Sequence, residues 1–134
     1  MTKKIVAFTG SREITNEFLV VSILLKHYPT PKDIIVRVGD AKGVDAIVRD
    51  WADQEGLEIE IFEADWKKYG RSAGPIRNAA MMIGANEYCA IWDGVSRGTK
   101  NAINEAIGNK IPGSIFVFPN KDEKMKTSIF TVKS

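Results

Sequence analysis

Short runs of β-branched and aromatic residues alternate with helical patterns along most of this chain, and this alternation limits the fold more than any other feature. The runs expected to be strands are Ile5–Thr9, Ile34–Val38, Glu58–Glu63, Tyr88–Trp92 and Ser114–Phe118. Strands separated by helices are typical of parallel βαβ units. We therefore predict an α/β fold, a Rossmann-like doubly wound parallel sheet of about five strands flanked by helices. The run Ser128–Val132 could add an edge strand at the C-terminal end.

The helical segments differ in how clearly they show an apolar face. The second has apolar residues at helical spacing, namely Val44, Ile47, Val48, Trp51 and Ala52. The fourth has the same spacing and ends at Gly108, with a face formed by Thr99, Ala102, Ile103, Ala106 and Ile107. The first, Phe18–Leu25, is apolar except for Ser22, so its burial should be wider than one stripe. A contact with a second subunit or deeper packing within the monomer would each explain this excess.

Composition sets limits on the class of protein. With 134 residues, of which 44% are hydrophobic and 27% charged, residues 1–134 should form a single domain with a real core. The net charge of +2 argues against a protein that mainly coats a polyanion, although local basic clusters remain compatible with it. A single cysteine, Cys89, and a single histidine, His27, exclude an internal disulfide and a Cys/His metal centre. We expect no metal and no cofactor.

No stretch of the chain approaches the roughly 20 apolar residues that a membrane helix needs. The apolar run near the N-terminus is also too short for the core of a signal peptide. A cytoplasmic location without a membrane partner is the resulting expectation. The polar segment Lys121–Lys126 is expected to be a solvated loop.

The loops that should follow the carboxyl ends of the strands are unusual. They read TGSR, GDAKGVD, EADWKKYGRSAGPIRN and WDGVSRGT, and all carry glycine and basic residues. The loops expected at the opposite rim, HYPTPKD, QEGLE and GNKIPGS, have the composition of plain turns. Because ligands of open parallel sheets bind outside the carboxyl ends of the strands, this asymmetry predicts a site for a phosphorylated ligand.

Within the third loop, the segment from Gly70 to Asn78 surrounds a predicted helix start with two arginines, Arg71 and Arg77. Pro75 fits a first helical turn, and Gly74 is expected just before it. A helix N-terminus offers unpaired amide hydrogens and a partial positive charge, so these arginines would add to a site that favours phosphate. An ordinary loop whose arginines face water is the alternative.

The residues predicted to contact the ligand come from all of these loops. They are Gly10, Ser11, Arg12, Gly39, Asp40, Gly43, Asp45, Trp66, Arg71, Gly74, Arg77, Asn78, Gly94, Gly98 and Thr99. Trp66 and its neighbour Tyr69 could stack on a base or sugar, or could pin a long loop to the body of the protein. Cys89 and Trp92, in a predicted central strand, are expected to pack in the core, and His27 to lie at the surface.

These loops also resemble those of a known group of proteins. TGSR (9–12), GDAKGVD (39–45), DWKKYGRSAGPIRNAAM (65–81) and GVSRGT (94–99) are similar to motifs of the SLOG superfamily, which contains the Lonely Guy phosphoribohydrolases and the DNA-processing protein A family. The likeness is greatest to the small YpsA-related SLOG proteins, and the tract 65–81 is its most specific part. The resemblance implies a Rossmann-like sheet and a role in binding or processing nucleotides.

The resemblance keeps several functions open. A nucleotide sensor or processor leads, with a homo-oligomer as a further option. Lonely Guy enzymes use an arginine and the glutamate of a GTxxE motif to hydrolyse an N-glycosidic bond, whereas Ala102 stands three residues after Thr99 here. In a hydrolase, Arg77 would stabilise developing charge, and Asp45 or Asp93 would be the acid or base. Binding of single-stranded nucleic acid is the third reading, and its affinity should fall steeply with salt.

Overall fold

The computed structural model describes residues 3–119 and 130–133. Helices and strands alternate through the chain, with additional 3-10 turns at Pro31–Asp33 and Gly70–Ser72. The elements are β1 (Lys4–Gly10), α1 (Glu17–His27), β2 (Ile34–Gly39), α2 (Val44–Gln54), β3 (Glu58–Phe62), α3 (Trp66–Tyr69), α4 (Ala73–Met82), β4 (Glu87–Trp92), α5 (Arg97–Gly108), β5 (Gly113–Val117) and β6 (Phe130–Lys133).

The strands form one sheet in the order β3-β2-β1-β4-β5-β6, in which β1 to β5 are parallel and β6 runs antiparallel to β5. This confirms the predicted doubly wound sheet. The chain builds outward from β1 in one direction and from β4 in the other. Phe8 in β1 therefore pairs with Val38 on one side and Cys89 on the other. Such a switch in strand order leaves a crevice at the carboxyl ends of the two central strands.

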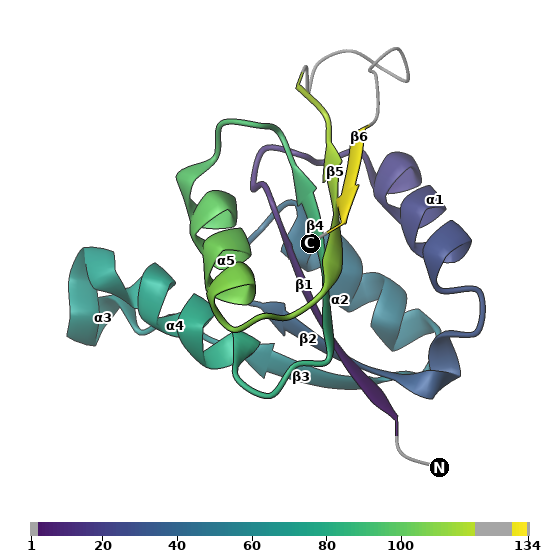
Figure 1. The fold of residues 1–134 in the computed structure, drawn as a ribbon, viewed down its shortest axis with the longest axis horizontal. Coiled ribbons are helices and arrows are strands. Elements are labelled where there is room, and N and C mark those ends of the chain that lie inside the picture. Colours follow the sequence, from purple (N-terminus) through teal and green to yellow (C-terminus); the bar gives the residue numbers. More distant parts are fainter. Residues whose placement is uncertain (1–2, 120–129, 134) are drawn as a thin grey trace.

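Helices cover both faces of the sheet (Figure 1), with α1 and α2 on one face and α4 and α5 on the other. Alternate residues of β4 divide between the two resulting cores. Cys89 and Ile91 pack with α1 and α2, whereas Tyr88 and Ala90 pack with α4 and α5. The interpretation of Cys89 as a core residue is confirmed. Trp92 is half-buried, and its Nε1 donates to the carbonyl oxygen of Ser96 at 3.0 Å.

The connection between β3 and β4 differs most from expectation. It contains the short helix α3, which Asp65 caps by accepting a hydrogen bond from the Lys68 amide at 3.0 Å. α4 begins at Ala73, so Gly74 lies inside its first turn, and the prediction that Gly74 precedes the helix is wrong. A four-residue helix is too short to show an apolar period, which is why the pattern suggested only a loop.

Helix α1 buries Val20, Ile23 and Leu24. On its outer side, Phe18 is 69% exposed and Leu25 is 53% exposed. Deeper packing within the monomer therefore does not explain its excess of apolar residues, and the contact with a second subunit stays a prediction. His27 is exposed at the end of the helix, as expected, with its ring 4.7 Å from that of Phe116.

Strand β6 confirms the predicted C-terminal edge strand over Phe130–Lys133, while positions 128 and 129 fall outside the described residues. The predicted loop Lys121–Lys126 also lies outside them. Across the part of the chain that the structure describes, no helix is long and apolar enough to cross a membrane.

Candidate functional site

A cavity of about 630 Å³ lies at the carboxyl ends of the parallel strands. All of the loops with unusual composition contribute to it. Its lining consists of Thr9, Gly10, Arg12, Glu13, Gly39, Ala41, Asp45, Trp66, Arg71, Gly74, Pro75, Arg77, Asn78, Met81, Ser96, Arg97, Gly98, Thr99 and Asn101. Segments up to about 90 residues apart in the sequence therefore meet in one hollow, as the parallel topology requires.

Most of the predicted ligand-binding residues line this cavity. They are Gly10, Arg12, Gly39, Asp45, Trp66, Arg71, Gly74, Arg77, Asn78, Gly98 and Thr99. Four predicted residues are not part of the lining, namely Ser11, Asp40, Gly43 and Gly94. Sequence reasoning did not place Met81 or Asn101 at the site. Met81 follows Arg77, and Asn101 follows Gly98, by about one helical turn, so helical spacing could have found both.

Ser11 is fully buried and joins three loops. Its amide donates to the Ile91 carbonyl at 3.0 Å, and its Oγ accepts a hydrogen bond from the Asp93 amide at 3.0 Å. Its carbonyl oxygen accepts from the amides of Ile14 and Val44. Ser11 thus holds the β1–α1, β2–α2 and β4–α5 loops together next to the cavity residue Gly10.

Two glycines allow these loops to approach closely. A Cβ at Gly10 would collide with the Val44 side chain at the start of α2. Gly43 has φ +74°, and a Cβ there would collide with the main chain of Arg12. Gly43 therefore allows the β1–α1 and β2–α2 loops to contact each other, while Gly10 also borders the cavity.

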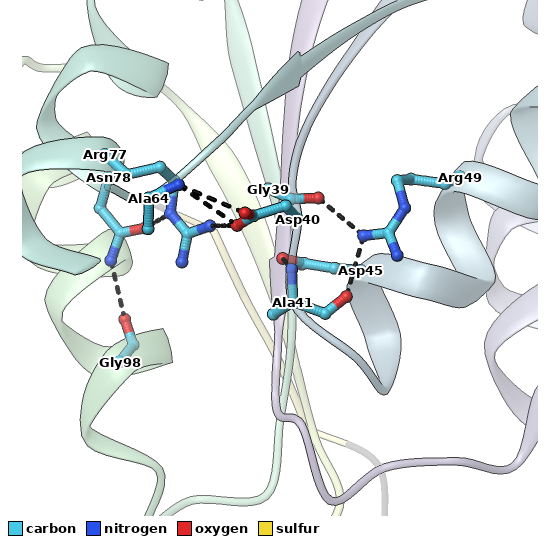
Figure 2. Close-up of polar contacts among 9 residues, drawn as sticks. All are labelled: Gly39, Asp40, Ala41, Asp45, Arg49, Ala64, Arg77, Asn78 and Gly98. Carbon is cyan, nitrogen blue, oxygen red and sulfur yellow. Dashed lines mark hydrogen bonds and ion pairs between the residues drawn. The ribbon is translucent and has the colours of Figure 1, made fainter. Parts of the chain in front are cut away.

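Arg77 of α4 connects the β2–α2 loop, through Asn78, to the start of α5 (Figure 2). Its Nη1 donates to Asp40 Oδ1 at 2.8 Å, and its Nε donates to Asn78 Oδ1 at 2.9 Å. Asn78 Nδ2 in turn donates to the Gly98 carbonyl at 3.2 Å and to Asn101 Oδ1 at 2.9 Å. This network fixes α4 against both the β2–α2 loop and the start of α5.

Asp45, in the first turn of α2, is only 5% exposed and belongs to the cavity lining. Its Oδ2 accepts a hydrogen bond from the Ala41 amide at 3.3 Å. Arg49 Nη1 holds the same loop by donating to the carbonyl oxygens of Gly39 and Ala41, both at 2.8 Å (Figure 2). Burial raises the pKa of Asp45 to about 6, although Arg77, the Ala41 hydrogen bond and Arg49 act in the opposite direction.

Asp93 lies outside the lining and has a different role. It accepts hydrogen bonds from the amides of Val95 and Ser96 at 2.9 and 2.8 Å and from Ser96 Oγ at 2.7 Å. Burial by itself would raise the pKa of Asp93, but these hydrogen bonds outweigh it and hold the pKa below its ordinary value. Asp93 shapes the turn before α5, so of the two aspartates considered as acid or base only Asp45 faces the cavity.

The mouth of the cavity is cationic and aromatic. Arg12, Arg71 and Arg97 are exposed, and no ion pair forms on them within the described ranges 3–119 and 130–133. The Arg12 guanidinium carbon lies 5.8 Å from the centre of the Trp66 ring system. The indole rests over Gly74, where a Cβ would stand 3.3 Å from it. Trp66 therefore pins the long connection and borders the cavity at once.

The first turn of α4 is less available to an anion than the sequence suggested. The 3-10 turn Gly70–Ser72 runs directly into α4, and the Ala73 amide donates to the Gly70 carbonyl.

Among the described residues, no group of three or more His, Cys, Asp or Glu side chains could hold a metal ion.

Comparison with known proteins adds family context to this geometry. A profile of the YspA, cpYpsA-related SLOG family matches residues 4–69, which run from β1 to α3 and include the β1–α1 and β2–α2 loops. The chain is also similar to the Gene 61 protein of Mycobacterium phage D29. The two are 33% identical over 114 residues, which cover 80% of this chain and 91% of the phage protein. The profile match ends within the tract 65–81 that carries the most specific part of the resemblance.

Proposed function

Because this chain belongs to the YspA, cpYpsA-related SLOG family, we propose that its rim cavity binds a nucleotide or a nucleotide-derived phosphorylated ligand, as a sensor or processor. Membership of a SLOG family suggests a nucleotide-related function.

One observation carries the proposal, namely that three exposed arginines with no acidic partner among the described residues border one cavity. They are Arg12, Arg71 and Arg97, and they come from the β1–α1 loop, the connection before α4 and the start of α5. Guanidinium groups form paired hydrogen bonds to phosphate oxygens, so cations from separate loops favour a phosphorylated ligand. Trp66 beside Arg12 supplies an aromatic surface on which a flat base can stack.

A thermal-shift panel tests this proposal. Mononucleotides, dinucleotides and ADP-ribose, each at millimolar concentration, should raise the melting temperature if one of them binds with a micromolar dissociation constant. The variants Arg12→Ala, Arg71→Ala and Arg97→Ala should each reduce the shift. Lys32→Ala removes an exposed cation before β2, at the opposite rim, and should leave the shift unchanged. The absence of a shift with every compound overturns the proposal.

Hydrolysis of a nucleotide is the second candidate, because Asp45 combines a pKa near 6 with a place in the cavity lining close to Arg77. A carboxyl group with that pKa can exchange a proton near neutral pH. The position of the Lonely Guy glutamate is occupied by Ala102, which is fully buried. Chromatography of incubated nucleoside monophosphates decides the matter: release of free base that Asp45→Asn abolishes supports hydrolysis, and unchanged substrate removes it.

A further inference from the structure

The cavity has opposite charge at its mouth and in its interior. Arg12, Arg71 and Arg97 are exposed, whereas the carboxyl group of Asp45 is buried to 5% exposure in the same lining. Arg77 also lines the cavity and acts on the charge of Asp45, and its Nη1 donates to Asp40 Oδ1 at 2.8 Å. The interior therefore presents an acidic acceptor beside an arginine that already has a partner.

The placement of Asp45 is set by its neighbours. A Cβ at Gly39 would lie 2.6 Å from Asp45 Oδ2 and 2.5 Å from Arg77 Nη1, so the missing side chain of Gly39 leaves room for both groups. Within the described residues, the single hydrogen bond of the Asp45 side chain is the one that Oδ2 accepts from Ala41. Two acceptor oxygens offer about four lone-pair positions, so most of the capacity of this carboxylate is unused.

This charge distribution orients an asymmetric ligand. A phosphate placed beside Asp45 would meet a like charge where little water screens it, which is costly. The same phosphate at the mouth would meet three guanidinium groups. A neutral group rich in hydroxyl donors, by contrast, would complete the hydrogen bonding of Asp45.

Resting on the proposed function, we propose that the ligand binds with its phosphate at Arg12, Arg71 and Arg97 and that the Asp45 carboxylate accepts hydrogen bonds from the hydroxyl groups of its sugar. Asp45 is then a specificity-determining residue that selects ribonucleotides over nucleotides whose sugar lacks these hydroxyls. A site built to bond a hydroxyl group discriminates strongly against an analogue without it, because its own polar group is left unpaired.

Isothermal titration with paired ligands tests this assignment. Adenosine, guanosine, cytidine and uridine 5′-monophosphates and 5′-diphosphates are compared with their 2′,3′-dideoxy counterparts at pH 7.5. The wild-type protein should bind the ribose form about tenfold or more tightly, the range expected for a hydrogen bond to a charged acceptor. Asp45→Asn should reduce that ratio to about threefold or less. The difference in affinity between 5′-diphosphates and 5′-monophosphates should stay as in the wild-type protein. The matched control Asp50→Asn changes an exposed residue on the same helix and should leave the ratio unchanged.

The pH dependence of the same ratio is a second readout. Both members of a pair carry the same phosphate, so protonation of the phosphate cancels in the ratio. The other charged residues of the cavity lining, Arg12, Arg71, Arg97 and Glu13, are the same in both measurements. Burial raises the pKa of Asp45 to about 6; of the charged groups that act on it, Arg77 and Arg49 lower this pKa and Asp40 raises it. The ratio should therefore fall between pH 7.5 and pH 5 in the wild-type protein and stay constant in Asp45→Asn.

The outcomes separate this inference from the function on which it rests. If no nucleotide binds the wild-type protein, both fail. If nucleotides bind but the dideoxy forms bind equally well, or if Asp45→Asn leaves the ratio intact, the role of Asp45 is overturned while nucleotide binding stands.

Discussion

Asp45 lies in the first turn of α2 and Asp93 in the β4–α5 loop, and both are 5% exposed, yet their surroundings shift their pKa values in opposite directions. Asp93 accepts three hydrogen bonds from its own loop, and its pKa is lowered. Asp45 accepts one, and burial raises its pKa to about 6. Hydrogen bonding, rather than burial alone, distinguishes the carboxylate of Asp93, which stabilises a turn, from that of Asp45, which faces the cavity.

The largest expected effect on unfolding free energy comes from substitution of Gly43, the glycine near Asp45. In Gly43→Ala, alanine would have to adopt φ +74°, and its Cβ would collide with the main chain of Arg12. We therefore expect a loss of about 4 kcal/mol in unfolding free energy. Urea unfolding measures this loss. A loss below about 1 kcal/mol would mean that the β2–α2 loop is not held against the β1–α1 loop as described.

Asp93→Ala removes all three hydrogen bonds from the turn before α5. We expect a loss of about 3 kcal/mol at pH 7, because two amides and a hydroxyl lose a charged acceptor. The lowered pKa of Asp93 means that its stabilisation is present above its ordinary value of 3.8 and disappears as pH falls below it. Urea titrations of both proteins should therefore converge at low pH, and a constant difference down to pH 2 would contradict this role.

Asp45→Asn should change the unfolding free energy in the opposite direction from Asp93→Ala, and by less. Removal of a buried charge is expected to raise the unfolding free energy by about 1 to 2 kcal/mol at pH 7.5. The raised pKa of Asp45 means that the native state binds its proton first, so the penalty is complete above pH 6 and fades toward pH 4. Melting temperatures of the two proteins should thus differ most at pH 7.5. A destabilised Asp45→Asn variant at that pH would show that ion pairing outweighs burial.

Gly94→Ala should have the smallest effect. Gly94 has φ +88°, but a Cβ there would stand 3.7 Å from the Val117 side chain, an ordinary contact. Only the backbone strain remains, and we expect a loss of about 1 kcal/mol in unfolding free energy. If Gly94→Ala proves as damaging as Gly43→Ala in the same urea assay, the β4–α5 loop is packed more tightly than described.

The sequence predicted most of the fold because its strands and main helices have regular apolar patterns. The faces of α2 and α5 follow directly from their residues at helical spacing, and the five parallel strands from their β-rich runs. The short helix α3 escaped detection, since four residues carry no period. The gathering of Gly10, Arg77 and Gly98 in one cavity was predictable from parallel topology alone.

The roles of individual rim residues were not predictable in the same way. Ser11 and Gly43 are of the residue types predicted to contact a ligand, but their atoms face neighbouring loops. Nothing in the local sequence distinguishes Asp45 from Asp93, because each comes shortly after a strand and close to a glycine. Their hydrogen-bond partners depend on how the loops turn.

By itself, the sequence determined the alternation of strands and helices, the parallel sheet and the rim where glycines and arginines gather, because apolar periodicity and chain direction act locally. Only the tertiary structure decided which carboxylate is satisfied by its own loop and which faces the cavity. That choice depends on how each loop turns around its own aspartate and on the burial that distant segments create, and the apolar pattern of the sequence records neither.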